Sequence, residues 1–335
     1  SQFGLTRLLL YPWLFYRRRQ AAVVGMEPDL FSPGDVLLLL DSSWHLDLWD
    51  EVIRQKEKNA IQVVSVIYDL VPERFPQYCV PELRKCFRDW LFKALAHSDR
   101  FIAISDFVRR DLIEFLESEG REKVDRSRFD YFYLGSELDL ARAADEVRGE
   151  LRTIFDGSRP VYIMVGTIEP RKNHRYLVEA FDLLNRRNLP VTVVIIGKVG
   201  WMCDEFLQSV RQHPLYGERL FAFHDIDDAE LGFCYHNAKA LVLPSLAEGF
   251  GLPVIEAMQR GLRVFASDIP IFREVGGEFA AYCDLNDPAS LADGIEAYER
   301  SGNFPAPRPI EEFKWLSWKE STYSLIEKTL AGVGR

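Results

Sequence analysis

The chain has 335 residues, 47% of them hydrophobic and 27% charged, and carries a formal net charge of −10. This length exceeds what one hydrophobic core usually serves, so two domains are expected, and the composition excludes a disordered protein. The acidic balance argues against a general nucleic-acid binder, because such proteins carry a basic surplus that neutralises phosphates.

The opening segment, residues 8–19 (LLLYPWLFYRRR), sets aromatic and aliphatic residues before three arginines. A signal peptide would have its basic residues before the apolar run, and no apolar run reaches the roughly 20 residues that span a bilayer. We expect a helix that packs on its own domain. The alternative is a peripheral contact with a membrane surface.

Short apolar, β-branched runs follow, each bounded by Gly, Pro, Asp or Ser. Such runs are typical of buried parallel strands joined by crossover helices, so residues 1–142 are predicted to form a Rossmann-like domain. The usual opening strand with its glycine-rich turn is not visible before Val36, so the domain is shorter than expected. The expected strands are 36–40, 63–68, 101–104 and 131–134.

A charged stretch, residues 137–159, is expected to connect this domain to a second Rossmann-like domain over residues 143–309. A Pro-rich piece at 304–309 breaks the periodicity, and a last amphipathic helix over 315–330, within the segment 310–335, is expected to cross back to the first domain. The expected strands of the second domain are 161–165, 191–196, 220–223, 240–243 and 263–266. Its expected helices are 176–185, 204–212, 228–237, 253–259 and 288–300.

The strongest chemical signal is residues 243–261, LPSLAEGFGLPVIEAMQRG, where Glu248 and Glu256 flank a Gly-Phe-Gly turn and Pro253 stands at the start of a helix. A strand, a glycine turn and a helix start present backbone N–H groups and a positive dipole end to an anion, which suits a diphosphate. Ionised glutamates accept hydrogen bonds from hydroxyls and can orient a ribose or a hexose. A single glutamate is commonly a solvated surface residue, so the prediction depends on the two glutamates occurring together with the glycines, Pro253 and a preceding apolar strand.

A second signal is residues 165–174, VGTIEPRKNH, at the end of the first strand of the second domain. Arg171 and Lys172 are expected in a loop at the carboxyl edge of the sheet, where open α/β folds bind ligands. An Arg fork and a Lys point charge could neutralise a leaving diphosphate. The alternative is a solvated basic loop.

These two stretches together resemble the C-terminal half of retaining GT-B glycosyltransferases of the family 4 type, with its E-x7-E motif. The resemblance implies an α/β protein of GT-B architecture, with two Rossmann-like, doubly wound domains that face a cleft. It extends through most of the chain, to residues 67–72 (IYDLVP), 103–112 (AISDFVRRDL), 133–138 (YLGSEL), 196–201 (IGKVGW) and 266–276 (ASDIPIFREVG).

The resemblance also implies roles for individual residues. Glu248 would hold hydroxyls of the transferred sugar, Glu256 the nucleotide ribose, and Arg171 and Lys172 the diphosphate, while Gly166 would permit close approach. Further positions assigned to donor binding are Thr167, Lys198, Ile226, Gly249, Phe250, Gly251 and Leu252, and the backbone amides of the last three would line the sugar and phosphate.

The first-domain motif would contribute Tyr68 and Asp69 to catalysis. Many relatives carry a His before this Asp, and although Tyr68 can still bind a sugar hydroxyl, the role of that His does not transfer to it. His45, at another expected strand end, is a candidate for compensating; the other interpretation is a structural histidine.

Asp225 and Asp227 match the Asp-x-Asp pattern that binds a metal in a different glycosyltransferase fold. Here they precede a helix, where aspartates serve as N-caps, so we expect a structural role and no metal. The five cysteines form no CxxC or Cys/His cluster, which indicates neither a disulfide framework nor a zinc site and fits a reducing cytoplasm.

The resemblance therefore implies a cytoplasmic retaining glycosyltransferase that needs no cofactor besides its nucleotide diphosphate sugar and acts on a glycan or lipid-linked acceptor. Residues 69–76 (DLVPERFP) resemble mannosyl- and rhamnosyltransferases of bacterial polysaccharide assembly, so GDP-mannose is the first choice of donor. The alternatives are another GT-B activity, such as a phosphorylase or epimerase, and a non-catalytic module that binds a glycan or a partner.

Overall fold

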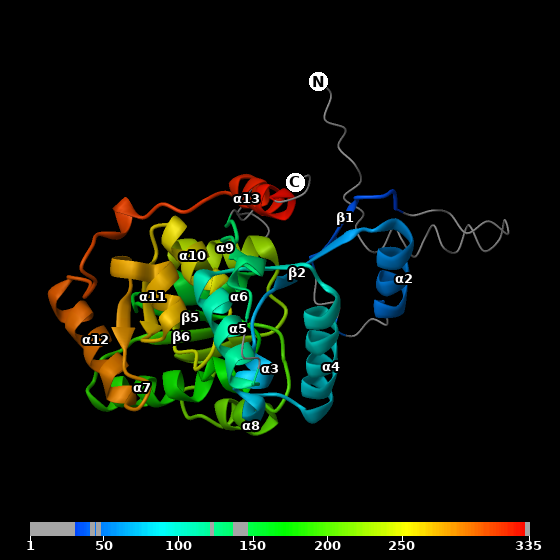
Figure 1. The fold of residues 1–335 in the computed structure, drawn as a ribbon. Coiled ribbons are helices and arrows are strands. Elements are labelled where there is room, and N and C mark those ends of the chain that lie inside the picture. The colour runs from blue at the N-terminus through cyan, green and yellow to red at the C-terminus, as the bar shows by residue number, and fades with distance from the viewer. Residues whose placement is uncertain (1–30, 41–43, 45–47, 121–123, 137–146, 332–335) are drawn as a thin grey trace. The chain divides into compact units, whose positions relative to one another are not determined.

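The structure, a computed structural model, describes residues 31–40, 44, 48–120, 124–136 and 147–331 (Figure 1). The segment 8–19, His45 and the expected domain boundary at residues 142 and 143 lie outside the described residues. The chain divides into two compact units. The first contains the described residues up to Arg74, Pro81–Tyr133 and the chain from Glu320; the second contains Phe75–Val80 and Leu134–Lys319.

The first unit is built on a four-stranded parallel sheet in the order β1-β2-β3-β4. Its strands are β1 (Val36–Leu39), β2 (Gln62–Ile67), β3 (Arg100–Ala103) and β4 (Phe129–Tyr131). Its helices are α2 (Trp49–Asn59), α3 (Val71–Arg74), α4 (Pro81–His97), α5 (Asp106–Ser118) and most of α13 (Trp318–Leu330). Ser105 caps α5 by accepting a hydrogen bond from the Val108 N–H.

The last strand of this sheet begins two residues before its predicted position. Phe129 pairs with Phe101 in the sheet, and their rings stack at 5.2 Å. The carbonyl of Ala103, at the end of β3, accepts the Phe132 N–H, so β3 offers no further residue for pairing. The prediction of a strand over 131–134 was wrong because the neighbouring strand, and not the apolar run itself, set the register.

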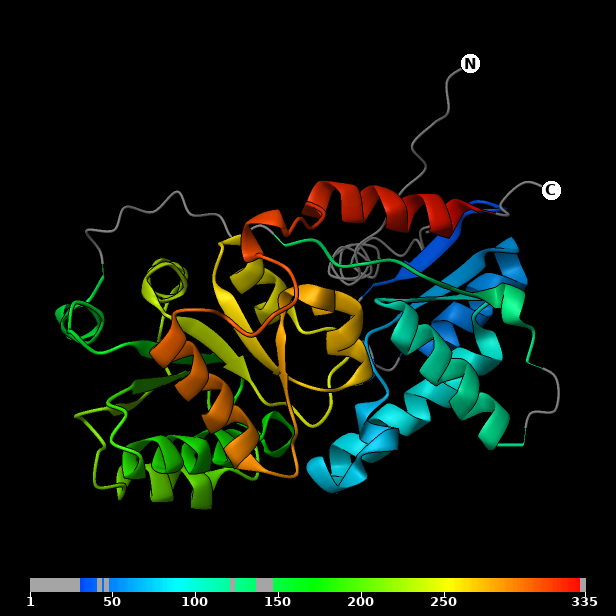
Figure 2. The same ribbon diagram turned by 90° about the vertical axis from the view of Figure 1, so that its left-hand side faces the viewer.

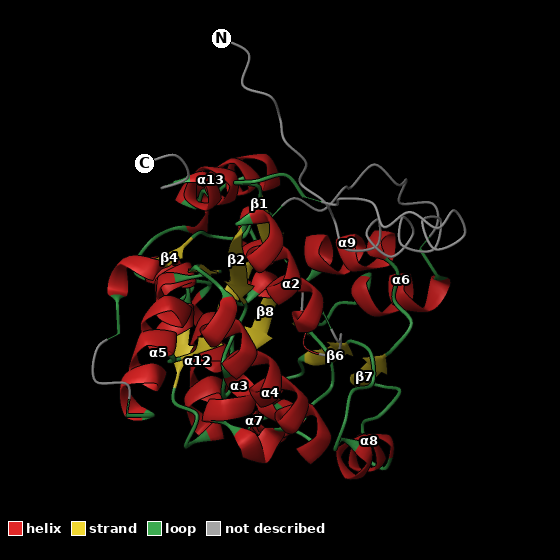
Figure 3. Cartoon of the chain, turned by 45° about the vertical axis from the view of Figure 1, so that its right-hand side comes forward, coloured by secondary structure: helices red, strands yellow, loops and turns green. Residues whose placement is uncertain are grey.

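The second unit is built on a six-stranded parallel sheet in the order β10-β9-β8-β5-β6-β7, with helices flanking its strands (Figure 3). Its strands are β5 (Val161–Val165), β6 (Thr192–Ile196), β7 (Leu220–Phe223), β8 (Ala240–Leu243), β9 (Arg263–Ser267) and β10 (Ala281–Cys283). Its helices are α6 (Gly149–Phe155), α7 (His174–Arg186), α8 (Asp204–Arg211), α9 (Asp228–Asn237), α10 (Leu252–Gln259), α11 (Pro270–Gly276) and α12 (Pro288–Ser301). The sequence predicts neither α11 nor β10, because seven and three residues are too few to show a period.

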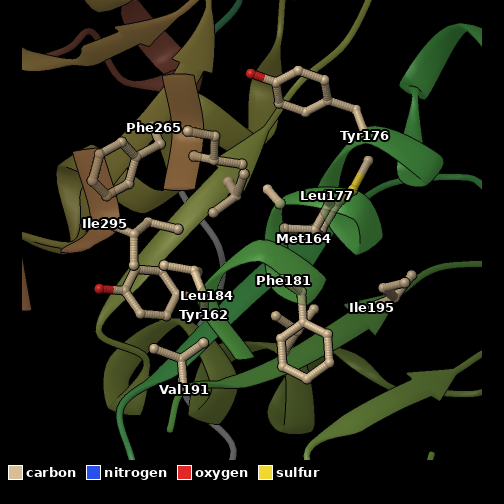
Figure 4. Close-up of a cluster of buried hydrophobic side chains, with 14 of the residues drawn as sticks. Tyr162, Met164, Tyr176, Leu177, Phe181, Leu184, Val191, Ile195, Phe265 and Ile295 are labelled. Carbon is tan, nitrogen blue, oxygen red and sulfur yellow. The ribbon is translucent and has the colours of Figure 1, made fainter. Parts of the chain in front are cut away.

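Helices cover both faces of this sheet, which explains why β5 and β6 are buried along their whole length. Alternate residues of β5 point to opposite faces, and Met164 packs with Leu177 and Phe181 of α7 in the main core (Figure 4). Helices α7 and α12 lie side by side over this face (Figure 2).

The backbone of Gly135 lies close to the backbone at the start of α13. A Cβ added to Gly135 would lie 2.4 Å from the Trp318 Cα, so only glycine fits there. Within the first unit, Ser321 of α13 donates its hydroxyl to the Tyr133 carbonyl and Lys328 pairs with Asp130. Among the described residues, no helix combines the length and apolar character needed to cross a membrane.

Replacing Gly197 by Ala should destabilise the second unit by more than about 2 kcal/mol, because a Cβ there would lie 1.8 Å from the Gly166 carbonyl oxygen. Urea unfolding followed by circular dichroism measures the change. Gly149→Ala is the matched control, since a Cβ on that residue of α6 meets nothing within 4 Å. An unchanged Gly197→Ala midpoint would contradict the close approach of the loops after β5 and β6.

Candidate functional site

The order of the second sheet determines where a site can form. From β5 the chain continues to β6 and β7 on one side and then returns to β8, β9 and β10 on the other. Open α/β sheets bind ligands outside the carboxyl ends of their strands at such a reversal. The loops that leave β5 and β8 carry residues 166–172 and 244–251, so the fold brings the two predicted motifs together at this point.

Glu248 lies at the centre of an ionic cluster formed by these loops. Its side chain is only 6% exposed, and its Oε2 accepts a hydrogen bond from Arg171 Nη1 at 2.7 Å. Its Oε1 accepts from Lys172 Nζ at 2.5 Å and from the Ser245 hydroxyl at 2.7 Å. Both carboxylate oxygens are therefore held, and the carboxylate has one orientation.

The backbone of the two loops holds the residues of this cluster in place. The Leu246 N–H donates to the Arg171 carbonyl at 2.7 Å and ties the two loops together. Gly166 has a φ of +148°, and a Cβ added to it would lie 3.4 Å from Lys172 Cε. Gly166 thus leaves room for the lysine side chain beside the strand end.

The cluster determines the protonation state of Glu248. Burial alone would raise the pKa of this carboxyl, but the charges of Lys172 and Arg171 and the hydrogen bonds from Lys172 and Ser245 lower it to about 2. Glu248 is a fixed anion at neutral pH.

Glu169 completes the cluster, although it was not among the site residues predicted from the sequence. It is buried, its Oε1 pairs with Arg171 Nη2 at 2.7 Å, and its Oε2 has no partner among the described residues. Burial raises its pKa, whereas the charges of Arg171 and Lys172 act in the opposite direction. A signal was present in the sequence, since an acidic residue two positions before Arg171 is a candidate partner for its charge.

The glycine turn leads directly into α10. Gly251 is the N-cap with a φ of +95°, and a Cβ on it would lie 2.6 Å from Phe272 Cε1, so the close approach also requires glycine. Pro253 stands in the first turn, as predicted. The positive end of the α10 dipole thus lies next to Glu248 along the chain.

Glu256 belongs to a second and different cluster. The hydroxyl of Tyr235 on α9 donates to Glu256 Oε2 at 2.8 Å, and Arg260 Nη1 donates to the Glu256 carbonyl at 2.6 Å. Burial raises the pKa of Glu256, and the Tyr235 hydrogen bond and the Arg260 charge oppose that rise. The glutamates of the E-x7-E motif therefore have unlike surroundings.

Other predicted donor-binding residues lie on the same edge of the second sheet without joining either cluster. Thr167 and Lys198 are exposed and Ile226 is half-buried, in the loops after β5, β6 and β7. None of them makes a hydrogen bond or ion pair to Glu248 in the described part of the chain.

The Asp-x-Asp pattern beside Ile226 is explained by local contacts. Asp227 caps α9 in a reciprocal capping box with Glu230, which confirms the N-cap prediction. Asp225 pairs with Arg148, which also holds the Glu230 carboxylate.

Tyr68 and Asp69 are described within the first unit, after β2. The Tyr68 hydroxyl donates to the Leu40 carbonyl at 2.5 Å, and the residue is 39% exposed. Asp69 Oδ1 accepts from the Val71 N–H at 2.9 Å, at the start of α3. Their proposed contact with substrate stays a prediction.

Comparison with known proteins identifies the second unit. Residues 152–308, which include both clusters, match the family model described as Glycosyl transferases group 1. The chain contains a glycosyltransferase group 1 domain. The expected resemblance of the two motifs to glycosyltransferases is thereby confirmed.

Several relatives are named as mannosyltransferases. A serotype-specific mannosyltransferase WbdA of Escherichia coli is 33% identical over 312 residues, which are 90% of this chain and 38% of the relative. An O-antigen chain mannosyltransferase B of Escherichia coli is 26% identical and covers 79% of this chain and 69% of its own length. The chain thus spans less than two fifths of the length of the WbdA relatives.

Solved structures share the fold at low identity. Sucrose-phosphate synthase from Thermosynechococcus elongatus matches 98% of this chain and 82% of its own with a TM-score of 0.66 and 19% identity. Anabaena HepE in complex with UDP and glucose matches 89% of this chain and 78% of its own with a TM-score of 0.65 and 15% identity. Together with the two parallel-sheet units, these similarities confirm the GT-B architecture.

Acid should weaken the wild-type fold partly through Glu248. Its folded pKa of about 2 lies below the ordinary 4.5, so its contribution is present above pH 4.5 and is lost as pH falls toward 2. Between pH 6 and pH 3.5 this loss amounts to about 1–2 kcal/mol of unfolding free energy. Glu248→Gln should be less stable at pH 6 and should lack this part of the decline in urea unfolding. Glu150→Gln, on the exposed start of α6, is the control and should follow the wild type; parallel profiles for Glu248→Gln and wild type would refute the assignment.

Proposed function

We propose that this chain is a retaining glycosyltransferase that moves a hexose from a nucleotide diphosphate sugar to a glycan or lipid-linked glycan acceptor. The observation that carries the proposal is the pair of cations, half-buried Arg171 and buried Lys172, held around Glu248 at the strand reversal of a group 1 domain. The alternative of a non-catalytic module is weakened by this cluster, since a module without chemistry needs no such buried charges.

The cations act on the leaving group. As the bond between the anomeric carbon and the diphosphate breaks, negative charge grows on the phosphate oxygens. Arg171 and Lys172, already oriented by their carboxylate partners, stabilise this charge without reorganisation, together with the positive end of α10. We propose that this neutralisation requires no metal ion.

Glu248 serves the sugar in this proposal. Its Oε2 accepts one hydrogen bond from a side chain, and a carboxylate oxygen has two acceptor sites, so one site is left for a sugar hydroxyl. Because both oxygens are held by protein donors, the hydroxyl meets an acceptor of fixed direction. Glu256, on the next part of α10, serves the nucleotide ribose.

Mannose is the proposed sugar, GDP-mannose the proposed donor, and cell-surface polysaccharide synthesis, including O-antigen, the proposed setting. The support is that the WbdA relatives are named as mannosyltransferases and that two further relatives are named as O-antigen chain mannosyltransferases. We propose a cytoplasmic location, which the five free cysteines support. Contact with the membrane surface through residues 8–19 belongs to the same proposal.

The proposal is tested by incubating the protein with GDP-, UDP-, dTDP- and ADP-sugars and mannose-terminated acceptors, and measuring nucleotide diphosphate and product by mass spectrometry. We expect release from GDP-mannose, retained in EDTA and lost in Glu248→Gln. Release that requires an added divalent cation would refute the metal-free chemistry. Nucleotide binding without product from any donor would favour the non-catalytic module.

Lys172→Met should lower kcat by about 100-fold and change the donor KM much less, because the lysine charge is needed most when the diphosphate leaves. Steady-state kinetics with the best donor measures both constants. Arg187→Gln is the control, since this arginine at the end of α7 pairs with Asp293 and Glu296 and contacts neither cluster. A raised KM with unchanged kcat in Lys172→Met would show that the lysine stabilises the bound donor and the transition state equally, and not the leaving diphosphate in particular.

A further inference from the structure

Tyr235 is a buried residue to which no role has been given. It is 1% exposed on α9, and its hydroxyl donates to Glu256 Oε2 at 2.8 Å. The guanidinium of Arg260 lies 5.2 Å from the centre of its ring, and the same arginine binds the Glu256 carbonyl. The ring is thus held by its neighbours, and its hydroxyl is a fixed donor.

The second oxygen of Glu256 is different. Within the described residues no protein group donates to Oε1, whereas Oε2 is bound by Tyr235. Glu256 is partly exposed, so Oε1 is the oxygen left for a ligand. The hydrogen bond from Tyr235 to Oε2 favours one orientation of the carboxylate, and in that orientation Oε1 is the oxygen that faces a ligand.

The Tyr235 hydrogen bond also favours the ionised form of Glu256, in which both oxygens can accept hydrogen bonds. Burial raises the pKa of this carboxyl, and the Tyr235 hydroxyl is the first of the groups that oppose the rise. A protonated carboxyl would lose acceptor capacity at one oxygen. Tyr235 therefore contributes both orientation and acceptor character.

We propose that Tyr235 is a positioning residue that holds Glu256 so that Oε1 accepts the ribose hydroxyls of the donor, and that this pair selects ribonucleotide over 2′-deoxyribonucleotide donors. The inference rests on the proposed function, because it takes Glu256 as the ribose-binding group. It adds a specificity: sugars carried on deoxynucleotides, such as dTDP, are poor substrates. A hydrogen bond to a charged group of this kind corresponds to a preference of about tenfold or more.

The test measures the dissociation constants of GDP, 2′-deoxy-GDP, UDP and 2′-deoxy-UDP by titration calorimetry for the wild type and Tyr235→Phe. For whichever of GDP and UDP binds more tightly, we expect the wild type to bind it about tenfold or more tightly than its 2′-deoxy form. We expect this ratio to fall to about threefold or less in Tyr235→Phe. Tyr162→Phe is the matched control: this tyrosine is also fully buried, donates to Glu299 at 2.5 Å in the core, and should keep the wild-type preference. Glu256→Gln is expected to lose it.

The outcomes separate the two proposals. A wild-type protein that binds no nucleoside diphosphate overturns the proposed function. If the wild type prefers the ribonucleotide and only Glu256→Gln loses this preference, while Tyr235→Phe keeps it, the role of Tyr235 alone is overturned. A wild type that binds the ribonucleotide and the deoxyribonucleotide equally well also overturns that role.

A crystal structure of the wild type with the better-bound nucleotide, GDP or UDP, is a second measurement that does not depend on a variant that folds. A ribose hydroxyl on Glu256 Oε1, with Oε2 still on Tyr235, is expected. A ribose bound through Oε2 with Tyr235 displaced would overturn the inference.

Discussion

The buried ion cluster around Glu248 is the constraint on which the second unit depends. A carboxylate that is 6% exposed must be paired, and its partners Arg171 and Lys172 come from a loop far away in the sequence. The loops after β5 and β8 must therefore meet, which requires those strands to be neighbours in the sheet. Gly166 makes room for the lysine, and the Leu246 hydrogen bond holds the loops in register.

The E-x7-E motif contains two carboxylates that their surroundings have made unlike. Glu248 is surrounded by two cations and a hydroxyl, and its pKa is lowered to about 2. Glu256 is held by the neutral Tyr235 hydroxyl, and burial raises its pKa. Glu248 is thus a permanent anion that orients two cations, whereas Glu256 is a partly exposed hydrogen-bond acceptor. The difference follows from the residues that pack against each side chain.

Much of the second unit could be predicted from the sequence, and the failures have physical reasons. The strands β5, β6 and β8 are continuous apolar runs because helices cover both faces of the sheet, so composition alone reveals them. The strand β10 has three residues and no measurable period. In the first unit, the position of β4 depends on where β3 ends, which no local pattern contains.

The sequence by itself determined the α/β class, the glycine turn before α10 and the residues that could bind an anion, because apolar runs, glycines and charged side chains express these properties locally. Only the tertiary structure decided which charges meet. It paired Arg171 with both Glu169 and Glu248 and placed the Tyr235 hydroxyl on Glu256. The order of strands in a parallel sheet is set by long-range packing, so contacts between residues 76 or 77 positions apart are invisible in the sequence.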